Sequence, residues 1–512
     1  NITFEKIHFK PFTTLVLKNT VITDRDPVSD PYDSLSAKVD TFFRSEYIIA
    51  RFTLDGLFKQ ESLHLDKVFI DNAQMNLVLE DMNENRNKDN LSRIFRIRKP
   101  ESPRIPKEKE IFHIRKVEIH DMGFAMKDRK SDRSDSPESG IDWTDLQVNN
   151  IEINAKDLRF RNGIMSGELL DLTFDEKSGY VMRHMEGTAK VGRGKTIVED
   201  LVINDPWSEV NLPLFMMSYD NIKAFKDFIT LVKLDAEIAE SVLDFKTLSY
   251  FSPSLSNNNL KLDVTGRMSG HIDDFTFADI NINSHSGGFK GKASGRISGL
   301  PEIEDTYLDA RLSNFSLTSK GLSHFISQWT NGQSMDLGRF ASGTTFRLNG
   351  RCAGLMNALK VSADIRSGLG SAKANVRLDN LVTKGAQTGI SGSVSTEDLD
   401  IGKVIGNDML GPVTLKRVLS AQLGESPDIA IDTLKVDRLH VNGYDYSEMT
   451  AKGHLSSTGF DGSIACHDPH LNFLFQGAFA LSPKTQNARY SFWCNVGHAD
   501  LNALNLDKRG IS

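Results

Sequence analysis

Residues 346–361, FRLNGRCAGLMNALKV, alternate apolar and polar side chains on both sides of a glycine-containing turn. Phe346 and Leu348 lie before the turn, and Leu359 and Val361 lie after it. Alternation with a period of two is typical of strands that bury one face. A parallel sheet covered by helices on both sides would instead show continuous apolar runs. The stretch therefore predicts two antiparallel strands, each with one apolar and one polar face.

This pattern repeats along the chain. Residues 262–277, LDVTGRMSGHIDDFTF, match 346–361 at an offset of 84, and 475–483 resemble 289–301 as a partial third copy. Repeats of this kind predict a fold that grows along one axis, with each unit packed against its neighbours. We therefore expect an all-β, mainly antiparallel fold. Its sheet should be elongated, repetitive and curved, forming a taco-like hydrophobic groove with an apolar concave face and a polar convex face.

The N-terminal part has a repeat of its own. LHLDKVFIDNAQMNL (63–77) matches FHIRKVEIHDMGFAM (112–126) at an offset of 49. An alternating strand, a turn and a second strand are predicted in both copies, and the same short form returns at 2–22, 146–160 and 431–441.

Helical periodicity is confined to a few places. Apolar residues at spacings of three and four predict one or two amphipathic helices over 218–250, ending before Pro253. Shorter helices between repeats are expected at 320–329, 399–406 and 413–421. These assignments divide the chain into an N-terminal β region (1–217), a helical segment (218–252) and a repetitive β-groove region (253–512).

Two segments, 82–110 and 127–140, are poor in apolar residues and are predicted to be flexible insertions. Residues 93–116 carry nine Lys or Arg against three Glu. This basic stretch is either a solvated loop or a patch that approaches an anionic membrane surface, where each basic residue contributes roughly 1 kcal/mol.

Composition excludes several classes of function. The chain has 61 Lys and Arg against 68 Asp and Glu, and this mild acidity argues against nucleic acid as a partner. Three cysteines exclude a disulfide framework. No apolar run reaches the ~18–20 residues that span a bilayer. The chain begins at Asn1 without a leader sequence, so we expect a piece of a longer protein.

Catalytic and metal signals are weak, and the sequence predicts no enzyme, metal site or cofactor. The one tight cluster of ligand-type residues, CHDPH (466–470), lacks zinc-site spacing and a second pair. Cys494 alternates with Tyr490 and Phe492 and is predicted to be a small buried apolar residue. A glycan-active enzyme would normally show more exposed tryptophans than the four present here.

Several segments together resemble the AsmA/TamB-like family. The opening ITFEKIHFKPFTTLVLKNTVITD and the L-x-L-x-K-V-x-I type units at 63–70 and 112–119 are similar to the start of these proteins. The repeats after residue 260, with G-x-x-x-G turns and closing segments LSNFSLTSKGLSHFI and VSTEDLDIGKVIG, resemble the large TamB-type envelope proteins of diderm bacteria. The resemblance covers nearly the whole chain and rests on pattern and order.

This resemblance implies an inner-membrane anchor helix before the segment, a β-rich body in the periplasm and a C-terminal domain at the outer membrane. It implies bridge-like phospholipid transport between the two membranes, in which a groove shields acyl chains. The alternative is a scaffold or assembly factor that pairs its exposed sheet edge with an outer-membrane β-barrel protein.

Residues on the alternating apolar positions are the candidates for a lipid-binding lining. Alternation alone fits an open groove and a filled core equally well. The candidates are Leu262, Val264, Phe275, Phe277, Phe346, Leu348, Leu359, Val361, Leu471, Phe473, Phe475, Phe479, Tyr490 and Phe492.

Overall fold

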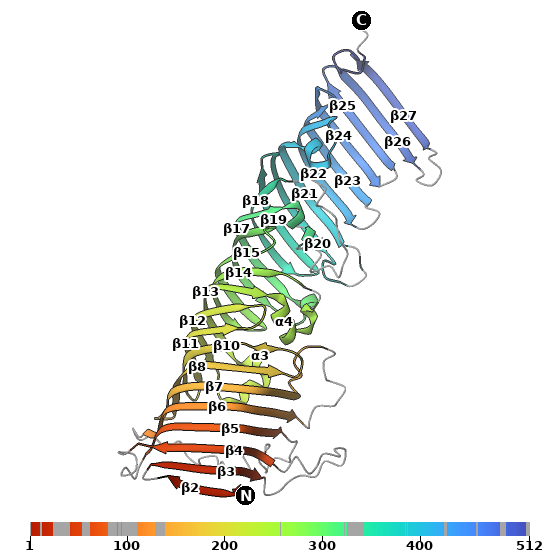
Figure 1. Ribbon diagram of the computed structural model, residues 1–512. Helices are drawn as coiled ribbons and strands as arrows, with labels where there is room; N and C mark the ends of the chain where they lie inside the picture. Colours follow the sequence, from red (N-terminus) through yellow and green to blue (C-terminus); the bar gives the residue numbers. More distant parts are fainter. Residues whose placement is uncertain are drawn as a thin grey trace, which may run out of the picture. The chain divides into compact units, whose positions relative to one another are not determined.

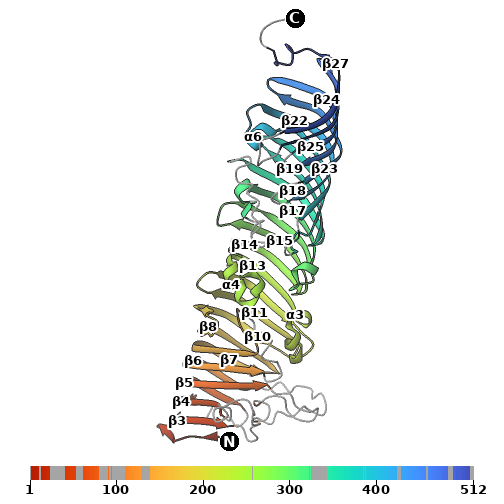
Figure 2. The same cartoon turned by 90° about the vertical axis from the view of Figure 1, so that its right-hand side faces the viewer.

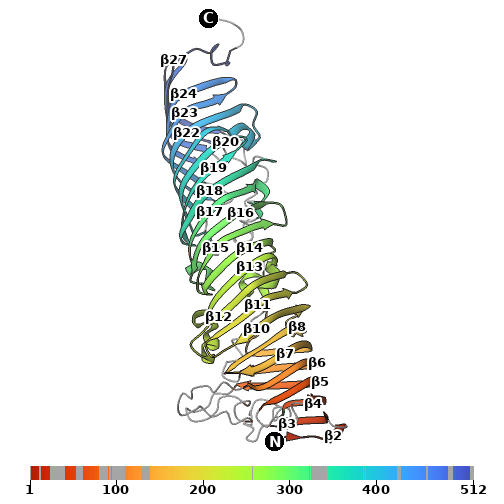
Figure 3. The ribbon, with the colours of Figure 1, turned by 90° about the vertical axis from the view of Figure 1, so that its left-hand side faces the viewer.

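The structure is a computed structural model (Figure 1). It describes residues 2–10, 13–23, 41–53, 62–79, 90, 94, 110–128, 139–256, 258–321, 323–324, 343–383, 386, 388–423, 428–456, 459–481 and 488–507. The chain forms two compact units, Asn1–Asn259 and Leu260–Ser512. Each unit is an open, curved and mainly antiparallel β-sheet, which confirms the predicted fold class. The bending of the strands is visible in Figures 2 and 3.

The described residues of the first unit form thirteen strands and a few short helices. The strands are β1 (Ile2–Thr3), β2 (Lys6–Lys10), β3 (Thr14–Thr23), β4 (Thr41–Phe52), β5 (Leu63–Leu79), β6 (Glu110–Asp128), β7 (Asp145–Arg161), β8 (Ile164–Glu176), β9 (Val181–Met182), β10 (His184–Val191), β11 (Lys195–Asn204), β12 (Glu209–Ser218) and β13 (Lys233–Asp244). The helices are η3 (Ile222–Asp227), α3 (Phe228–Leu231), α4 (Phe245–Phe251) and η4 (Pro253–Leu255).

The described residues of the second unit form fourteen strands. They are β14 (Lys261–His271), β15 (Asp274–Ser284), β16 (Phe289–Ser298), β17 (Tyr307–Thr318), β18 (Thr345–Leu355), β19 (Ala358–Ser367), β20 (Gly370–Asp379), β21 (Thr388–Asp400), β22 (Leu410–Leu423), β23 (Asp428–Val441), β24 (Tyr444–Ser456), β25 (Gly459–Asp468), β26 (Leu471–Leu481) and β27 (Ala488–Ala499). Short helices interrupt the series: η5 (Ile303–Asp305), α6 (Ile401–Ile405) and a helical stretch of which residues 319–321, 323 and 324 are described.

The offset of 84 residues relates two antiparallel hairpins to each other. The β14–β15 hairpin, moved by 84 positions, falls on the β18–β19 hairpin. Gly270 and Gly354, which the alignment matches, both have φ close to +140°, a value that favours glycine. The sequence repeat is therefore a structural repeat.

The offset of 49 residues has a different meaning, because its two copies are neighbours. β5 and β6 pair in parallel with a register of 49: Leu63 lies opposite Phe112, Val68 opposite Val117 and Ile70 opposite Ile119. A parallel pair requires a long connection. The predicted insertion 82–110 supplies it, although most of that segment, like most of 127–140, lies outside the described residues. Asn90 is described: its side chain is buried and bonds the backbone of Asn76 and Val78 on β5.

The pair of strands predicted at 2–22 is present, as the antiparallel β2 and β3. The turns predicted at 63–77 and 112–126 are absent: each of these two copies is one continuous strand with a single residue in the left-handed region. Asn72 (φ 46°) and Asp121 (φ 49°) occupy this position in the two copies. Asn and Asp tolerate positive φ better than most residues. At Asp121 the pairing of β6 with β7 shifts by one residue, which is a β-bulge. The polar residue that suggested a turn bends the strand instead.

Several of these bulges face a glycine on the neighbouring strand. Gly187 faces the bulge at Asp200, Gly266 the bulge at Asp279, and Gly370 the bulge at Asp398. A Cβ atom on Gly370 would lie 2.4 Å from the carbonyl oxygen of Asp398. Bulges increase local bending, and the glycines make room for them.

The helical prediction for 218–250 is only partly right. Short helices lie near both ends of the segment, as η3 with α3 and as α4, but residues 233–244 form β13. Ile238 and Val242 were assigned to a helix because they are four residues apart. A spacing of four is also a multiple of the strand period of two, and Leu234 and Ala236 complete that alternation.

Two of the shorter helix predictions can be compared with the structure. The helix expected at 399–406 is confirmed as α6, whereas 413–421 lies in β22 and is a strand. Of 320–329, only residues 320, 321, 323 and 324 lie within the described chain, and all four are helical.

The apolar face of the first unit is partly covered by its own chain. Leu17, Ile48, Ile70, Ile119, Ile153 and Leu172 are cross-strand neighbours from β3 to β8. Phe174 is two residues beyond Leu172 and contacts the buried Tyr180, which packs against Tyr250 of α4 at a ring distance of 5.6 Å. Ile141, Tyr180 and Met182 form a closed core at this place.

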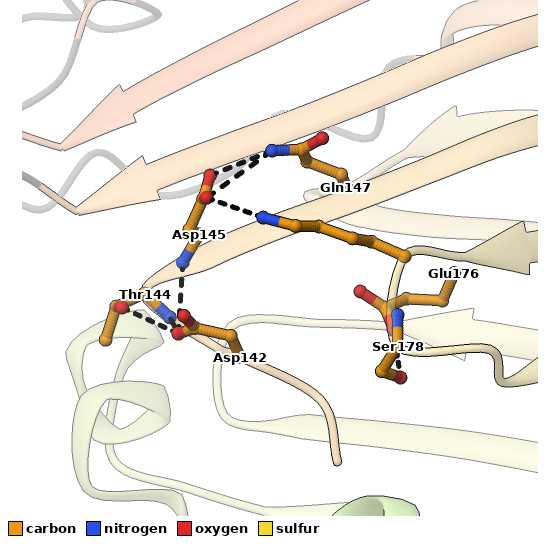
Figure 4. Close-up of polar contacts among 7 residues, drawn as sticks. Asp142, Thr144, Asp145, Gln147, Glu176 and Ser178 are labelled. Atoms are coloured by element: carbon orange, nitrogen blue, oxygen red, sulfur yellow. Dashed lines mark hydrogen bonds and ion pairs between the residues drawn. The ribbon is translucent and has the colours of Figure 1, made fainter. Parts of the chain in front are cut away.

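The polar network beside this core fixes the start of β7 (Figure 4). Asp142 accepts hydrogen bonds from the backbone N–H and the hydroxyl of Thr144. Lys177 donates to Asp145 at 2.9 Å. Partial burial acts to raise the pKa of Asp145, but the hydrogen bonds from Lys177 and Gln147 outweigh it, and the pKa is lowered. These side chains therefore hold the loop before β7 against the β8–β9 turn.

We expect the substitution Gly370→Ala to destabilise the β20–β21 pair by about 1–3 kcal/mol. The new Cβ would collide with the bulge at Asp398, and the φ of Gly370, +125°, is unfavourable for alanine. Native-state hydrogen exchange of β20 and β21 measures this cost. Gly368→Ala is the matched control, because no atom lies within 4 Å of its Cβ position. Equal exchange rates in the two variants would show that the glycine–bulge contact is unimportant.

Candidate functional site

The second unit has one continuous row of apolar cross-strand neighbours, here called the first rung. Residues directly opposite each other on paired strands lie on the same face of a sheet. By backbone register the first rung crosses the fourteen described strands of this unit, and none of its residues is of a polar or charged type. It consists of Met268, Phe277, Gly295, Ala310, Cys352, Val361, Val376, Gly392, Leu419, Ile431, Gly453, Gly462, Gly477 and Phe492.

Two further rows run beside it on the same face. The second rung is Leu359, Leu378, Ile390, Ala421, Ile429, Leu455, Phe460, Phe479 and Tyr490. The third rung is Phe315, Leu348, Ile365, Ala372, Thr396, Leu415, Val436, Met449, Cys466, Phe473 and Val496. Thr396 is the only polar residue in these two rows. The three rungs define the apolar face of the second unit.

All fourteen candidate residues lie on this face. Phe277, Val361 and Phe492 are in the first rung, Leu359, Phe479 and Tyr490 in the second, and Leu348 and Phe473 in the third. The other six share a strand with a rung residue at even spacings (Met268 in the case of Leu262 and Val264), which places them on the same side: Leu262, Val264, Phe275, Phe346, Leu471 and Phe475.

The residues of this face are incompletely buried. Among the candidates, Leu262 and Leu359 are buried, while Phe479, Tyr490 and Phe492 are 41%, 69% and 56% exposed. The remaining nine are of intermediate exposure. A filled core would bury nearly all of them, as the aromatic core of the first unit buries Tyr180. The apolar side chains of the second unit therefore keep surface for a ligand.

Sequence reasoning missed most of the rung residues. Phe315, Leu378 and Phe460 were not among the candidates, although each is a direct neighbour of a candidate. Such residues are found from the cross-strand register. The sequence repeat at an offset of 84 reveals that register only within the β14–β15 and β18–β19 hairpins.

The opposite face is polar and carries cross-strand ion pairs. Arg296 pairs with Asp274, and Arg351 pairs with Asp309 at 2.6 Å. The hydrogen bond from Arg351 holds the pKa of Asp309 below its usual range. Arg438 pairs with Asp398 at 2.7 Å. These exposed pairs contribute little to stability, but they show that the two faces of the second unit differ sharply in chemistry.

Phenylalanine rings flank the glycines of the first rung in β24–β26. Gly453, Gly462 and Gly477 lie opposite each other, and a Cβ atom on Gly462 would lie 2.8 Å from the ring of Phe460. Phe460 contacts Phe475 and Phe479, with ring centroids 6.3 and 6.2 Å apart. Aromatic rings beside cross-strand glycines compensate for the missing side chains. These rings keep the face apolar at the three glycines, where no side chain covers the backbone.

The CHDPH segment is structural. Asp468 accepts hydrogen bonds from the hydroxyl and backbone N–H of Ser447, from Tyr444 and from the N–H of His470. Burial and this contact with Asp468 raise the pKa of Tyr444 to about 12. Cys466 is fully buried. The prediction for Cys494 is wrong: it is exposed, because β27 pairs with β26 along one side and no other described strand covers it.

Comparisons with family models, with curated proteins and with solved structures give no match. The AsmA/TamB-like resemblance therefore stays a prediction from sequence. Among the described residues, no helix has the length and apolar character needed to cross a bilayer.

We expect Phe473→Lys to weaken the binding of an apolar dye such as Nile red, because it places a charge in the third rung. Fluorescence titration of the dye measures the effect. Asn472→Lys adds the same charge on the adjacent residue of β26, which points to the polar face, and should leave dye binding unchanged. A similar loss in both variants would mean that the dye responds to net charge rather than to this face.

Proposed function

We propose that the apolar face of the second unit binds the acyl chains of phospholipids and that the protein is a bridge-like phospholipid carrier between the inner and outer membranes. The first rung carries this proposal. It crosses fourteen strands without a polar side chain, and at ~4.8 Å per strand it extends for roughly 60 Å within the unit.

The free energy of lipid transfer explains why an uninterrupted surface is needed. A phospholipid has roughly 30 methylene groups, and each one exposed to water costs ~0.8 kcal/mol. Passage through water unshielded would cost on the order of 20 kcal/mol. A continuous apolar surface lowers this barrier at every step, whereas a gap of a few polar strands would restore it. The function requires shielding and no catalytic group.

The proposed location rests on the family resemblance. Proteins of that family are anchored in the inner membrane and extend through the periplasm. The polar face of the second unit, with its exposed ion pairs, suits an aqueous compartment, and its apolar face suits a lipid. We propose the same location for this protein.

A second candidate function is a scaffold for outer-membrane β-barrel proteins. One observation favours it: β27 exposes Tyr490, Phe492, Trp493 and Val496, and among the described strands it pairs only with β26. A strand with one unpaired edge can accept a strand from another protein.

We expect the double substitution Leu348→Lys and Phe473→Lys to slow phospholipid transfer between donor and acceptor vesicles at least about tenfold, because each lysine interrupts the third rung. A fluorescent phospholipid reports the transfer rate. The matched control, Thr345→Lys with Asn472→Lys, adds the same charges on the polar faces of β18 and β26.

Crosslinking gives an independent measurement. Photoreactive residues at Phe346, Phe473 and Phe475 should crosslink to acyl chains, and one at Asn472 should not. Unchanged transfer by the double variant, in a protein with a native circular dichroism spectrum, would exclude this face as the lipid path. Capture of a barrel protein through β27 with intact rungs and no lipid would favour the scaffold function.

A further inference from the structure

Three possible metal ligands converge on the polar side of the β5–β6 pair. One donor atom from each of His64, Glu110 and His113 lies within 4.8 Å of the other two. His64 Nε2 is 3.7 Å from Glu110 Oε1. The three side chains are 18%, 25% and 18% exposed, so they are largely shielded yet open to an entering ion.

The repeat and a bulge bring these residues together. His64 and His113 occupy the same position in the two copies, and the parallel register of 49 places them side by side. A register shift between Glu110 and Phe112 inserts one extra residue in β6. Because the shift reverses the alternation, Glu110 lies on the same face as His113, three residues later.

Neighbouring side chains orient the two imidazoles. Asp157 on β7 bonds His113 Nε2 at 3.0 Å. Ser62 bonds His64 Nε2 at 2.8 Å, a bond that an ion at this nitrogen would replace. In protein metal sites a carboxylate commonly orients a ligating histidine in this way. Asp157 also contacts Arg159, which lies opposite His113 on β7. Arg161 lies opposite Glu110, so the two arginines of β7 balance the two carboxylates, and affinity for a cation rests on the ligand set rather than on net charge.

We propose that His64, Glu110 and His113 bind one divalent transition-metal ion, and that zinc is the ion that fits best. Two imidazole nitrogens and one carboxylate oxygen are a donor set that Zn²⁺ uses, with a fourth position open to water. Tetrahedral ligands at ~2.1 Å from the ion lie ~3.4 Å apart, so small rotations of these side chains complete the site. The ion joins β5 to the beginning of β6.

Calorimetric titration of the whole chain with Zn²⁺ tests this site, and Co²⁺ supplies a visible absorption spectrum for the same ligands. We expect one site per chain. His64→Gln and His113→Gln should each weaken binding at least about tenfold, and Asp157→Asn should weaken it about 10–100-fold by loosening His113. Zn²⁺ should raise the melting temperature of the unsubstituted chain, a readout that needs no variant.

His120→Gln is the matched control. His120 lies seven residues further along β6 and pairs with Glu152 at 2.8 Å, outside the cluster. The His120→Gln variant should bind Zn²⁺ with the same affinity as the unsubstituted chain. Absence of Zn²⁺ binding at millimolar concentration would overturn the proposal and leave the cluster as ion pairs. Equal affinity of the His64, His113 and His120 variants would overturn it too, because the ion would then lie elsewhere.

Discussion

Cross-strand register is the constraint on which the second unit depends. A strand places alternate side chains on opposite faces, so a shift of one residue moves every apolar side chain to the polar side. The first rung keeps its chemistry over fourteen strands only because each pairing preserves the face. Hydrogen bonds between strands set the spacing, but the register determines whether the apolar residues form one surface.

Bulges are what make this register compatible with bending. In β15, Phe275 and Phe277 precede the bulge at Asp279, and Ile280 and Ile282 follow it. The extra residue exchanges the faces of the odd and even positions that follow it. In the sequence, the apolar residues change from odd to even positions at the same place. All four side chains therefore share a face. Gly266 on β14 provides the room, since a Cβ there would lie 2.8 Å from the Cα of Ile280.

The fold class, the repeated hairpin and the shared face of the candidates could be predicted because each depends on local alternation. Features that depend on longer-range pairing could not. Ile238 and Val242 fit a helix and a strand equally well, and only the neighbouring β12 makes β13 a strand. Cys494 has the alternation of a buried residue, yet its exposure depends on what covers β27. The offset of 49 matches His64 with His113, but their contact could be predicted only by knowing that the two copies pair in parallel.

Parallel pairing of two copies of one sequence has a physical consequence that antiparallel hairpins avoid, because it puts like residues side by side. Lys67 lies beside Lys116, and His64 beside His113. The repulsion between the lysines is relieved by Glu118, which bonds both, and hydrogen bonds from Lys116 and Lys67 hold its pKa below the usual range. Glu110 stands in the same relation to the two histidines. Charged lysines offer no lone pair, so the cluster of Lys67, Lys116 and Glu118 cannot bind a cation. Neutral imidazoles do offer lone pairs, so the second cluster can accept a cation between them.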